Sequence, residues 1–387
     1  MKENNKVGLV TFYKDNFGSI LQCYATKVMI ERAGFKCIVI SQNGDKKEKN
    51  GKIKKKLTNL QNLIVNCYSD PTYFARWKRT RRIPVALTFE TIEKMNMFVE
   101  NEIKPKIYSW NDLTRIGYSD EFRFFISGSD QIWNAYNKIS PLYFLKFCSD
   151  EKKLAFAVSF GVNNPSKFFL DRIKRGIIGY DSISVREKSG IDIIKRISNV
   201  EITCIGDPAF MLDKNEWREF SENRICISED YILIHFLDCP NDLAIKKIIS
   251  IQSESKLKVI CIAYHYVLFE KLNWEFIDCG PREYIAYINR AKYVFTDSYH
   301  TTLFSINLGI NFFTFERQYL HGHPQSERII DLLRRFDVLD RYITTEKMLP
   351  ETEVMGLQKL VLQEKEYIIK YLYGKLGVIN ERKELLS

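Results

Sequence analysis

The stretch VGLVTFYKDNFGSILQCYATKVMIERAGFKCIVIS, residues 7–41, decides the fold class. Its opening apolar run predicts a buried strand, and residues 35–41 predict a second one. Between the two strands, apolar side chains recur at the three-to-four-residue spacing of one helix face: Leu21, Tyr24, Ala25, Val28 and Met29. Gly34 stands where helices commonly end. A strand, a helix and a strand in this order form a βαβ unit, which implies a parallel sheet with a right-handed crossover.

Strands and helices keep alternating along the chain, and the series restarts after a charged, loosely patterned stretch at 213–229. We therefore predict an α/β protein with two Rossmann-like, doubly wound domains that face each other across a cleft. The predicted domains are 1–225, with a basic insertion at about 42–85, and 226–345, followed by a C-terminal helical tail at 346–387. Ligands of such sheets bind beyond the carboxyl ends of the strands, so the turns there are the candidate sites.

The composition is that of a globular protein, with 45% hydrophobic residues. No stretch approaches the roughly 20 consecutive apolar residues that cross a bilayer. The sequence opens without a signal-peptide pattern, and its nine cysteines are an odd number with no CxxC pair. We therefore expect a cytoplasmic protein with reduced thiols.

The net charge of +10 is unevenly distributed. Residues 46–56 hold seven Lys and one Glu, and residues 76–82 add five more cations. One interpretation is a basic patch that meets an anionic membrane surface or a diphosphate-linked substrate, which would place the protein peripherally at the inner face of the membrane. The alternative is a solvated insertion. No helix-turn-helix, zinc-finger or RNA-binding signature is present, so we expect no nucleic-acid partner.

Two turns in the first half of the chain offer small and polar groups at predicted strand ends. The first lacks the GxGxxG dinucleotide fingerprint, but its groups stand at a helix start, where an anion is favoured; they are Asn16, Gly18 and Ser19. Its other interpretation is a plain capped turn. The second turn sets polar groups beside a tryptophan, as sugar sites do, although many tight turns look alike; its candidates are Ser127, Gly128, Ser129, Asp130, Gln131 and Trp133.

Two further turns carry charged or titratable groups. Arg186 follows a strand and precedes a helix, where it could bind a phosphate or carboxylate through two parallel hydrogen bonds, or form a surface pair with Glu187. His300 opens a later helix and could hold and release a proton near neutral pH. Its candidate neighbours are Asp297, Ser298, Thr301, Thr302, Ser326 and Arg328. His321 and His323 lie two residues apart in a loop, which is weak evidence for a metal site, and we expect no metal.

These motifs, in their order and spacing, resemble the polysaccharide pyruvyl transferase family. The resemblance runs from residues 7–26 through FISGSDQIWN (125–134) and ISVREKSG (183–190) to AKYVFTDSYHTTLFSI (291–306) and SERIIDLL (326–333). It implies a GT-B-like pair of Rossmann domains and transfer of the pyruvyl group of phosphoenolpyruvate onto a surface polysaccharide or its lipid-linked precursor. The sequence departs from the family pattern after His300, where Thr301 replaces a Gly.

By the same resemblance, Arg186 would bind phosphoenolpyruvate and His300 would serve as acid/base. Phosphoenolpyruvate is then a co-substrate, and no cofactor is expected. Trp133 and its turn are candidates for the acceptor sugar. One rival hypothesis is a GT-B glycosyltransferase that holds the ribose of a nucleotide sugar through Glu316 or Glu327. Another is a catalytically silent relative that binds sugars or anions.

Overall fold

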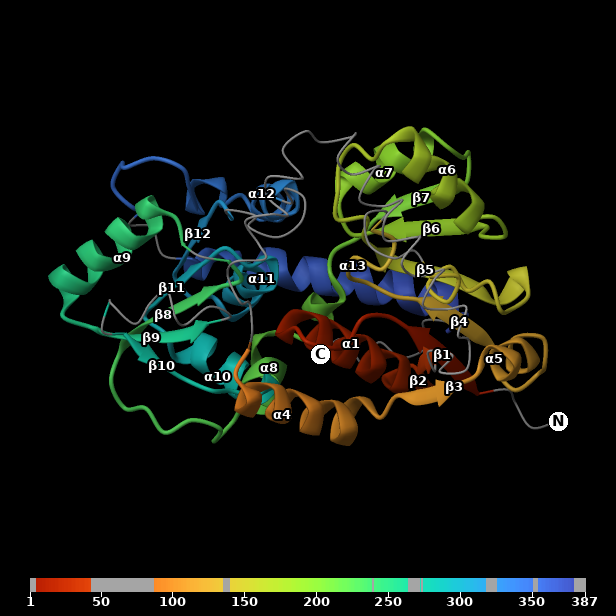
Figure 1. Cartoon of the computed structure of the whole chain (residues 1–387), viewed down its shortest axis with the longest axis horizontal. Helices are drawn as coiled ribbons and strands as arrows, with labels where there is room; N and C mark the ends of the chain where they lie inside the picture. The colour runs from red at the N-terminus through yellow and green to blue at the C-terminus, as the bar shows by residue number, and fades with distance from the viewer. Residues whose placement is uncertain are drawn as a thin grey trace, which may run out of the picture.

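The computed structural model describes residues 5–42, 87–134, 140–238, 240–263, 272, 274–317, 326–350 and 354–378. Within them two parallel sheets form the two halves of the molecule (Figure 1), which confirms the predicted pair of doubly wound α/β domains. Most of the predicted basic insertion, both cationic runs, and His321 and His323 lie outside the described residues.

The first sheet has seven strands in the order β3-β2-β1-β4-β5-β6-β7. Its strands are β1 Lys6–Val10, β2 Lys36–Gln42, β3 Lys106–Tyr108, β4 Phe124–Ser127, β5 Lys153–Val158, β6 Ser182–Val185 and β7 Glu201–Cys204. The helices in this part of the chain are α1 Phe17–Arg32, α4 Phe89–Phe98, α5 Trp110–Gly117, α6 Lys167–Gly176 and α7 Lys188–Lys195, of which α4 lies against Asp278 of the second domain. The strand order reverses between β1 and β4, the point where a doubly wound sheet opens a binding crevice.

The second sheet repeats this winding with six strands in the order β10-β9-β8-β11-β12-β13. Its strands are β8 Tyr231–Phe236, β9 Lys258–Ala263, β10 Glu275–Phe276, β11 Tyr293–Thr296, β12 Phe312–Phe315 and β13 Tyr342–Ile343. The helices of this half are α9 Asp242–Ser255, α10 Pro281–Arg290, α11 Tyr299–Leu308 and α12 Ser326–Arg335.

A short helix, α8 Lys214–Phe220, occupies the charged stretch where the sequence pattern loosens. Asp213 accepts hydrogen bonds from the Asn215 and Glu216 amides, and Glu216 accepts one from the Asp213 amide. This reciprocal cap satisfies the free amides of the first turn. The helix buries Trp217 completely, so the stretch between the sheets is an ordered part of the core.

The last helix, α13 Gln358–Leu376, runs between the two halves (Figure 1). Tyr371 stacks on Phe156 of β5 with ring centroids 6.4 Å apart, and Lys375 Nζ donates to Ser182 Oγ at 2.5 Å. At its other end, Gln358 Nε2 donates to the Asn307 carbonyl of α11 at 3.2 Å. The C-terminal helix therefore bridges the two domains. Among the described helices, none combines the length and the apolar composition of a membrane span.

Candidate active site

Arg186 is the first residue after β6 and lies buried against three carboxylates. Its Nη1 donates to Asp207 Oδ2 at 2.7 Å, its Nη2 lies 3.8 Å from Asp130 Oδ1, and its Nε lies 3.7 Å from Glu187 Oε2. Its guanidinium also lies over the Tyr299 ring, 4.6 Å from the centroid. Burial by itself would lower the pKa of Arg186, but Tyr299 and the three carboxylates raise it, so the group stays charged. Nε and Nη2 have no hydrogen-bond partner in the described part of the chain.

The carboxylates around Arg186 are themselves held by the first domain. Glu187 Oε1 accepts hydrogen bonds from Ser159 Oγ at 2.8 Å and from the Phe160 amide at 3.0 Å. Asp130 accepts a short hydrogen bond from Ser19 Oγ at the start of α1. Burial raises the pKa of Asp130, but the charges of Arg186 and His300 and the Ser19 hydrogen bond outweigh it, so the net pKa is lowered. These contacts fix anionic groups around one buried cation.

His300 reaches this cluster from the second domain. It is the second residue of α11, whose N-cap Ser298 accepts from the Thr301 amide at 3.4 Å. His300 Nε2 lies 3.6 Å from Asp207 Oδ2, an ion-pair distance. The His300 ring packs on Gly18, where an added Cβ would lie 2.0 Å from His300 Cγ. Gly18 is therefore required at the start of α1 because it lets the first turns of α1 and α11 meet.

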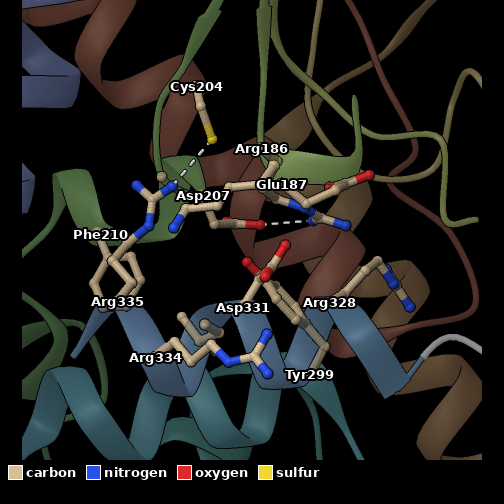
Figure 2. A pocket seen from close by; sticks show the side chains of 13 residues that line it. Arg186, Glu187, Cys204, Asp207, Phe210, Tyr299, Arg328, Asp331, Arg334 and Arg335 are labelled. Atoms are coloured by element: carbon tan, nitrogen blue, oxygen red, sulfur yellow. Dashed lines mark hydrogen bonds and ion pairs between the residues drawn. The ribbon is translucent and has the colours of Figure 1, made fainter. Parts of the chain in front are cut away.

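A cavity of about 260 Å³ adjoins Arg186 between the two domains. Figure 2 shows its side chains: those of α12 face those at the carboxyl ends of β6 and β7. Its lining carries five cationic side chains, Arg186, Lys188, Arg328, Arg334 and Arg335, and three carboxylates, Glu187, Asp207 and Asp331. The first turn of α7 begins at the same place, and helix starts favour anions. The cavity is therefore suited to a small anion.

Two of the cavity arginines are held by the protein in different ways. Arg335 Nη1 pairs with Glu364 Oε1 of α13 at 2.5 Å, and its Nη2 donates to Cys204 Sγ at 3.2 Å. Arg328 lies over the Tyr299 ring, 5.5 Å from the centroid. Burial and the charge of Arg186 lower the pKa of Arg328 to about 10. An arginine with a lowered pKa gains from an anionic ligand, because the ligand compensates the buried charge.

The structure brings several predicted site residues together. Arg186, His300, Asp130, Gly18 and Ser19 form one contact group, and Arg328 lies on the opposite wall of the cavity. Asn16 caps α1 by accepting from the Ser19 amide at 3.1 Å, and Ser326 is the first residue of α12. His300 itself is outside the cavity lining, whereas Asp207 both lines the cavity and contacts His300.

The interpretation of Trp133 as a sugar platform is wrong. Its side chain is completely buried, stacks on Phe144, and donates from Nε1 to Ser127 Oγ at 3.1 Å and to the Tyr143 carbonyl at 2.9 Å. Ser127 Oγ also donates to the Tyr143 carbonyl at 2.6 Å, so both side chains brace the following loop. No face of the indole remains for a sugar ring.

The other residues of this turn have structural contacts. Gly128 N donates to the Val10 carbonyl at 2.8 Å, and the Ser129 carbonyl accepts from Thr11 Oγ1 at the same distance. Gln131 Oε1 accepts from Asn134 Nδ2 at 2.7 Å. Within this turn, Asp130 is thus the side chain that reaches Arg186.

The expected neighbours of His300 are mostly turned away from it. Asp297 accepts from the Leu237 amide at 2.7 Å and from Arg317 Nε at 3.2 Å, so it ties β11 to β8 rather than orienting His300. Burial raises the pKa of Asp297, and Arg317 only partly offsets this. Thr302 Oγ1 donates to the Ser298 carbonyl at 2.9 Å and lies 2.9 Å from Thr314 Oγ1.

Asp207 is the site residue that the sequence interpretation missed. It is buried, accepts from the Ala209 amide at 2.9 Å and begins a 3₁₀ turn at Pro208–Met211. Its only sequence signal is the motif Gly206-Asp207-Pro208 just beyond a strand, which also suits an ordinary turn. Glu187 was open to interpretation as a surface partner of Arg186, but it is buried. Within the described residues no group of three or more potential metal ligands gathers.

Comparison with known proteins gives one family and one fold. The family model described as polysaccharide pyruvyl transferase matches residues 16–319. No curated protein matches the chain. Among solved structures, the chain is similar to MnaA of S. aureus in its UDP complex, with 10% identity, a TM-score of 0.51 and 98% of each chain covered. A putative UDP-N-acetylglucosamine 2-epimerase from Listeria monocytogenes gives 9% identity, a TM-score of 0.49, and coverage of 96% of this chain and 90% of that one.

At such identities the structural likeness establishes the GT-B fold alone. The family match covers well over half of the 387 residues and includes the turns that carry Arg186 and His300. The chain therefore belongs to the polysaccharide pyruvyl transferase family.

Proposed function

We propose that this transferase moves the pyruvyl group of phosphoenolpyruvate onto two hydroxyls of a sugar and forms a cyclic ketal. The observation that carries the proposal is the buried guanidinium of Arg186, whose Nε and Nη2 lack hydrogen-bond partners in the described structure, beside a cavity with five cationic side chains. Phosphoenolpyruvate carries a carboxylate and a phosphate, and both are natural acceptors for such donors.

The reaction balances without a further reactant. A proton added to C3 of the enol makes C2 electrophilic, and the oxygen of one sugar hydroxyl bonds to C2. The C2–O bond to phosphate breaks, and the second hydroxyl closes the ketal. One hydroxyl proton replaces the proton consumed at C3, and the other leaves on inorganic phosphate.

In this proposal His300 supplies the proton, and the cationic side chains that line the cavity bind the phosphate as it leaves. His300 Nε2 is buried and makes no hydrogen bond in the described structure, and the nearest carboxylate oxygen, Asp207 Oδ2, lies 3.6 Å from it. Negative charge develops on the leaving phosphate. Three prearranged groups would stabilise it: Arg186, Arg328 and the start of α7. Charge stabilisation of this kind is commonly the largest contribution to an enzymatic rate.

The acceptor is proposed to be a polysaccharide precursor on a lipid diphosphate carrier. Support comes from the composition: the 46–56 run holds seven Lys and one Glu, which favours an anionic surface. A soluble nucleotide-linked sugar is the alternative acceptor, and the test below includes it.

The test measures phosphate release from phosphoenolpyruvate with lipid-diphosphate-linked and nucleotide-linked oligosaccharides. Arg186→Ala would leave three buried carboxylates without their cation, at a cost of about 3–5 kcal/mol, so Arg186→Lys is the sharper variant. We expect His300→Gln to release phosphate about 10²–10⁴-fold more slowly. Arg186→Lys should raise KM for phosphoenolpyruvate, because an ammonium cannot make the paired contacts of a guanidinium.

The matched control is Arg115→Lys, which changes an exposed arginine of α5 and should leave both constants at the wild-type level. The proposal fails if folded His300→Gln and Arg186→Lys proteins both retain wild-type rates. It also fails if nucleotide sugars, rather than phosphoenolpyruvate, raise the thermal unfolding temperature of the wild-type protein.

A further inference from the structure

One oxygen of Asp207 joins the two halves of the site. Oδ2 accepts from Arg186 Nη1 at 2.7 Å and lies 3.6 Å from His300 Nε2. Oδ1 is held separately by the Ala209 amide at 2.9 Å. The side chain is completely buried, so solvent does not screen these contacts. Arg186 and Asp207 come from the first domain, whereas His300 comes from the second.

Charged groups of both signs lie around His300. Asp130 and Asp207 face it from the turns of the first domain, and Arg186 lies between them. Tyr299 lies beside it on α11, with ring centroids 5.2 Å apart, and Arg328 approaches the cluster from α12. These carboxylates and guanidinium groups belong to the same charged cluster as His300. Asp207 is the nearest of these carboxylates to His300 Nε2, so its charge has the strongest electrostatic effect on the imidazole.

The Asp207 carboxylate is ionised in this arrangement. Burial raises its pKa, but His300, the charge of Arg186 and the Ala209 amide hold the pKa well below the ordinary range. An ionised carboxylate at 3.6 Å attracts a proton carried on His300 Nε2 and so orients the ring.

We propose that Asp207 is a positioning residue that orients His300 across the domain boundary and holds its proton for delivery to the substrate. The proposal rests on the proposed function, because it names the group that prepares the acid of that reaction. It makes proton donation depend on domain docking, since the carboxylate and the imidazole come from different sheets. Asp207 itself touches no reacting atom in this scheme.

The kinetic test is Asp207→Asn, which keeps an oxygen for the Ala209 amide and removes the charge. We expect kcat with phosphoenolpyruvate to fall about 10-fold or more. The alkaline limb of the kcat/KM profile should move to lower pH by about one unit or more, because the protonated imidazole loses its nearest counter-charge. KM for phosphoenolpyruvate should change less than kcat, because Arg186 keeps its charge.

The matched control is Asp213→Asn, another aspartate N-cap, which begins α8 and pairs with Lys365. It should leave the alkaline limb in place. If Asp207→Asn does not fold, Asp207→Ser keeps a capping oxygen and tests the same shift. A limb that stays at the wild-type pH in a folded Asp207 variant overturns the proposal.

A second measurement is independent of any reaction. A double-mutant cycle of Asp207→Asn and His300→Gln, followed by denaturant unfolding, should be non-additive at pH 6 and approach additivity at pH 9. Additivity at both pH values overturns the positioning role. If wild-type protein releases no phosphate but the cycle is pH-dependent, the proposed function fails while the coupling between Asp207 and His300 stands.

Discussion

Thr301 stands where the family pattern has glycine, yet its side chain points away from the site. Its hydroxyl lies 2.7 Å from His235 Nδ1 and 2.9 Å from the Tyr284 hydroxyl, and the residue is completely buried. The Thr301 side chain therefore does not narrow the approach to the start of α11. The methyl and hydroxyl fill the core of the second domain, behind the face of α11 that carries His300.

His235, the partner of Thr301, makes the stability of the protein depend on pH. Burial, together with the smaller effect of the Arg317 charge, lowers the pKa of His235 to about 3. Between pH 6.5 and 3 the unfolded chain therefore binds a proton that the folded chain does not. Stability is fully present above about pH 6.5 and falls as the pH drops toward 3, with a slope approaching ~1.4 kcal/mol per pH unit.

Denaturant unfolding at pH 7, 6, 5 and 4 measures this slope. We expect His235→Asn, which keeps an amide group near the Thr301 hydroxyl, to lose stability at pH 7 and to show a flatter dependence on pH. Equal slopes for the two proteins would show that another group is responsible.

Asp130 and Asp207 add a separate loss of folding stability at lower pH, because their lowered pKa values place their titration below the ordinary carboxylate range.

At the scale of elements, helix α13 shows how two glycines of one helix differ. Gly377 ends the helix with φ of +71°, a conformation that favours glycine. Gly374 lies one turn earlier, is exposed, and has open space where a Cβ would stand. Glycine inside a helix costs stability because it is more flexible in the unfolded chain.

Gly374→Ala should therefore raise the free energy of unfolding by about 0.5–1 kcal/mol. Gly377→Ala is the matched comparison and should lower it, because alanine is strained at positive φ. Chemical unfolding of the three proteins in parallel checks both signs. A loss of stability in Gly374→Ala would mean that α13 does not continue through this turn.

At the scale of the whole molecule, the two domains share one core. Phe17 of α1 stacks on Tyr284 of the second domain, with centroids 4.5 Å apart and planes 5° apart, and meets the His235 ring edge-on at 6.0 Å. Buried residues of both sheets, such as Leu9 and Leu233, belong to one continuous apolar cluster. A shared core of this kind couples the unfolding of the two halves.

We therefore expect a single cooperative unfolding transition, with calorimetric and van't Hoff enthalpies that agree. Phe17→Ala should lower the free energy of unfolding by about 3–5 kcal/mol, because it leaves a cavity between the domains. Phe168→Ala, on an exposed ring of α6, should cost far less. Two separate transitions in the wild-type protein would contradict a shared core.

Local sequence patterns were enough to predict two doubly wound sheets and the strand ends where the site lies. Apolar periodicity is a local property, so the strand and helix of residues 7–41 could be recognised from their own residues. Arg186 and His300 could be singled out because each follows a predicted strand, and carboxyl ends of strands converge in doubly wound sheets. The motifs also carried the family resemblance.

The direction in which individual side chains point depends on the folded chain. Trp133 is buried because Tyr143 and Phe144 close over it, and Thr301 turns inward because Tyr284 and His235 offer it partners. Asp207 became visible as a site residue because Arg186 and His300, 21 and 93 positions away, meet at one of its oxygens. Burial and charge pairing depend on residues that are distant in the chain, and no local pattern contains that information.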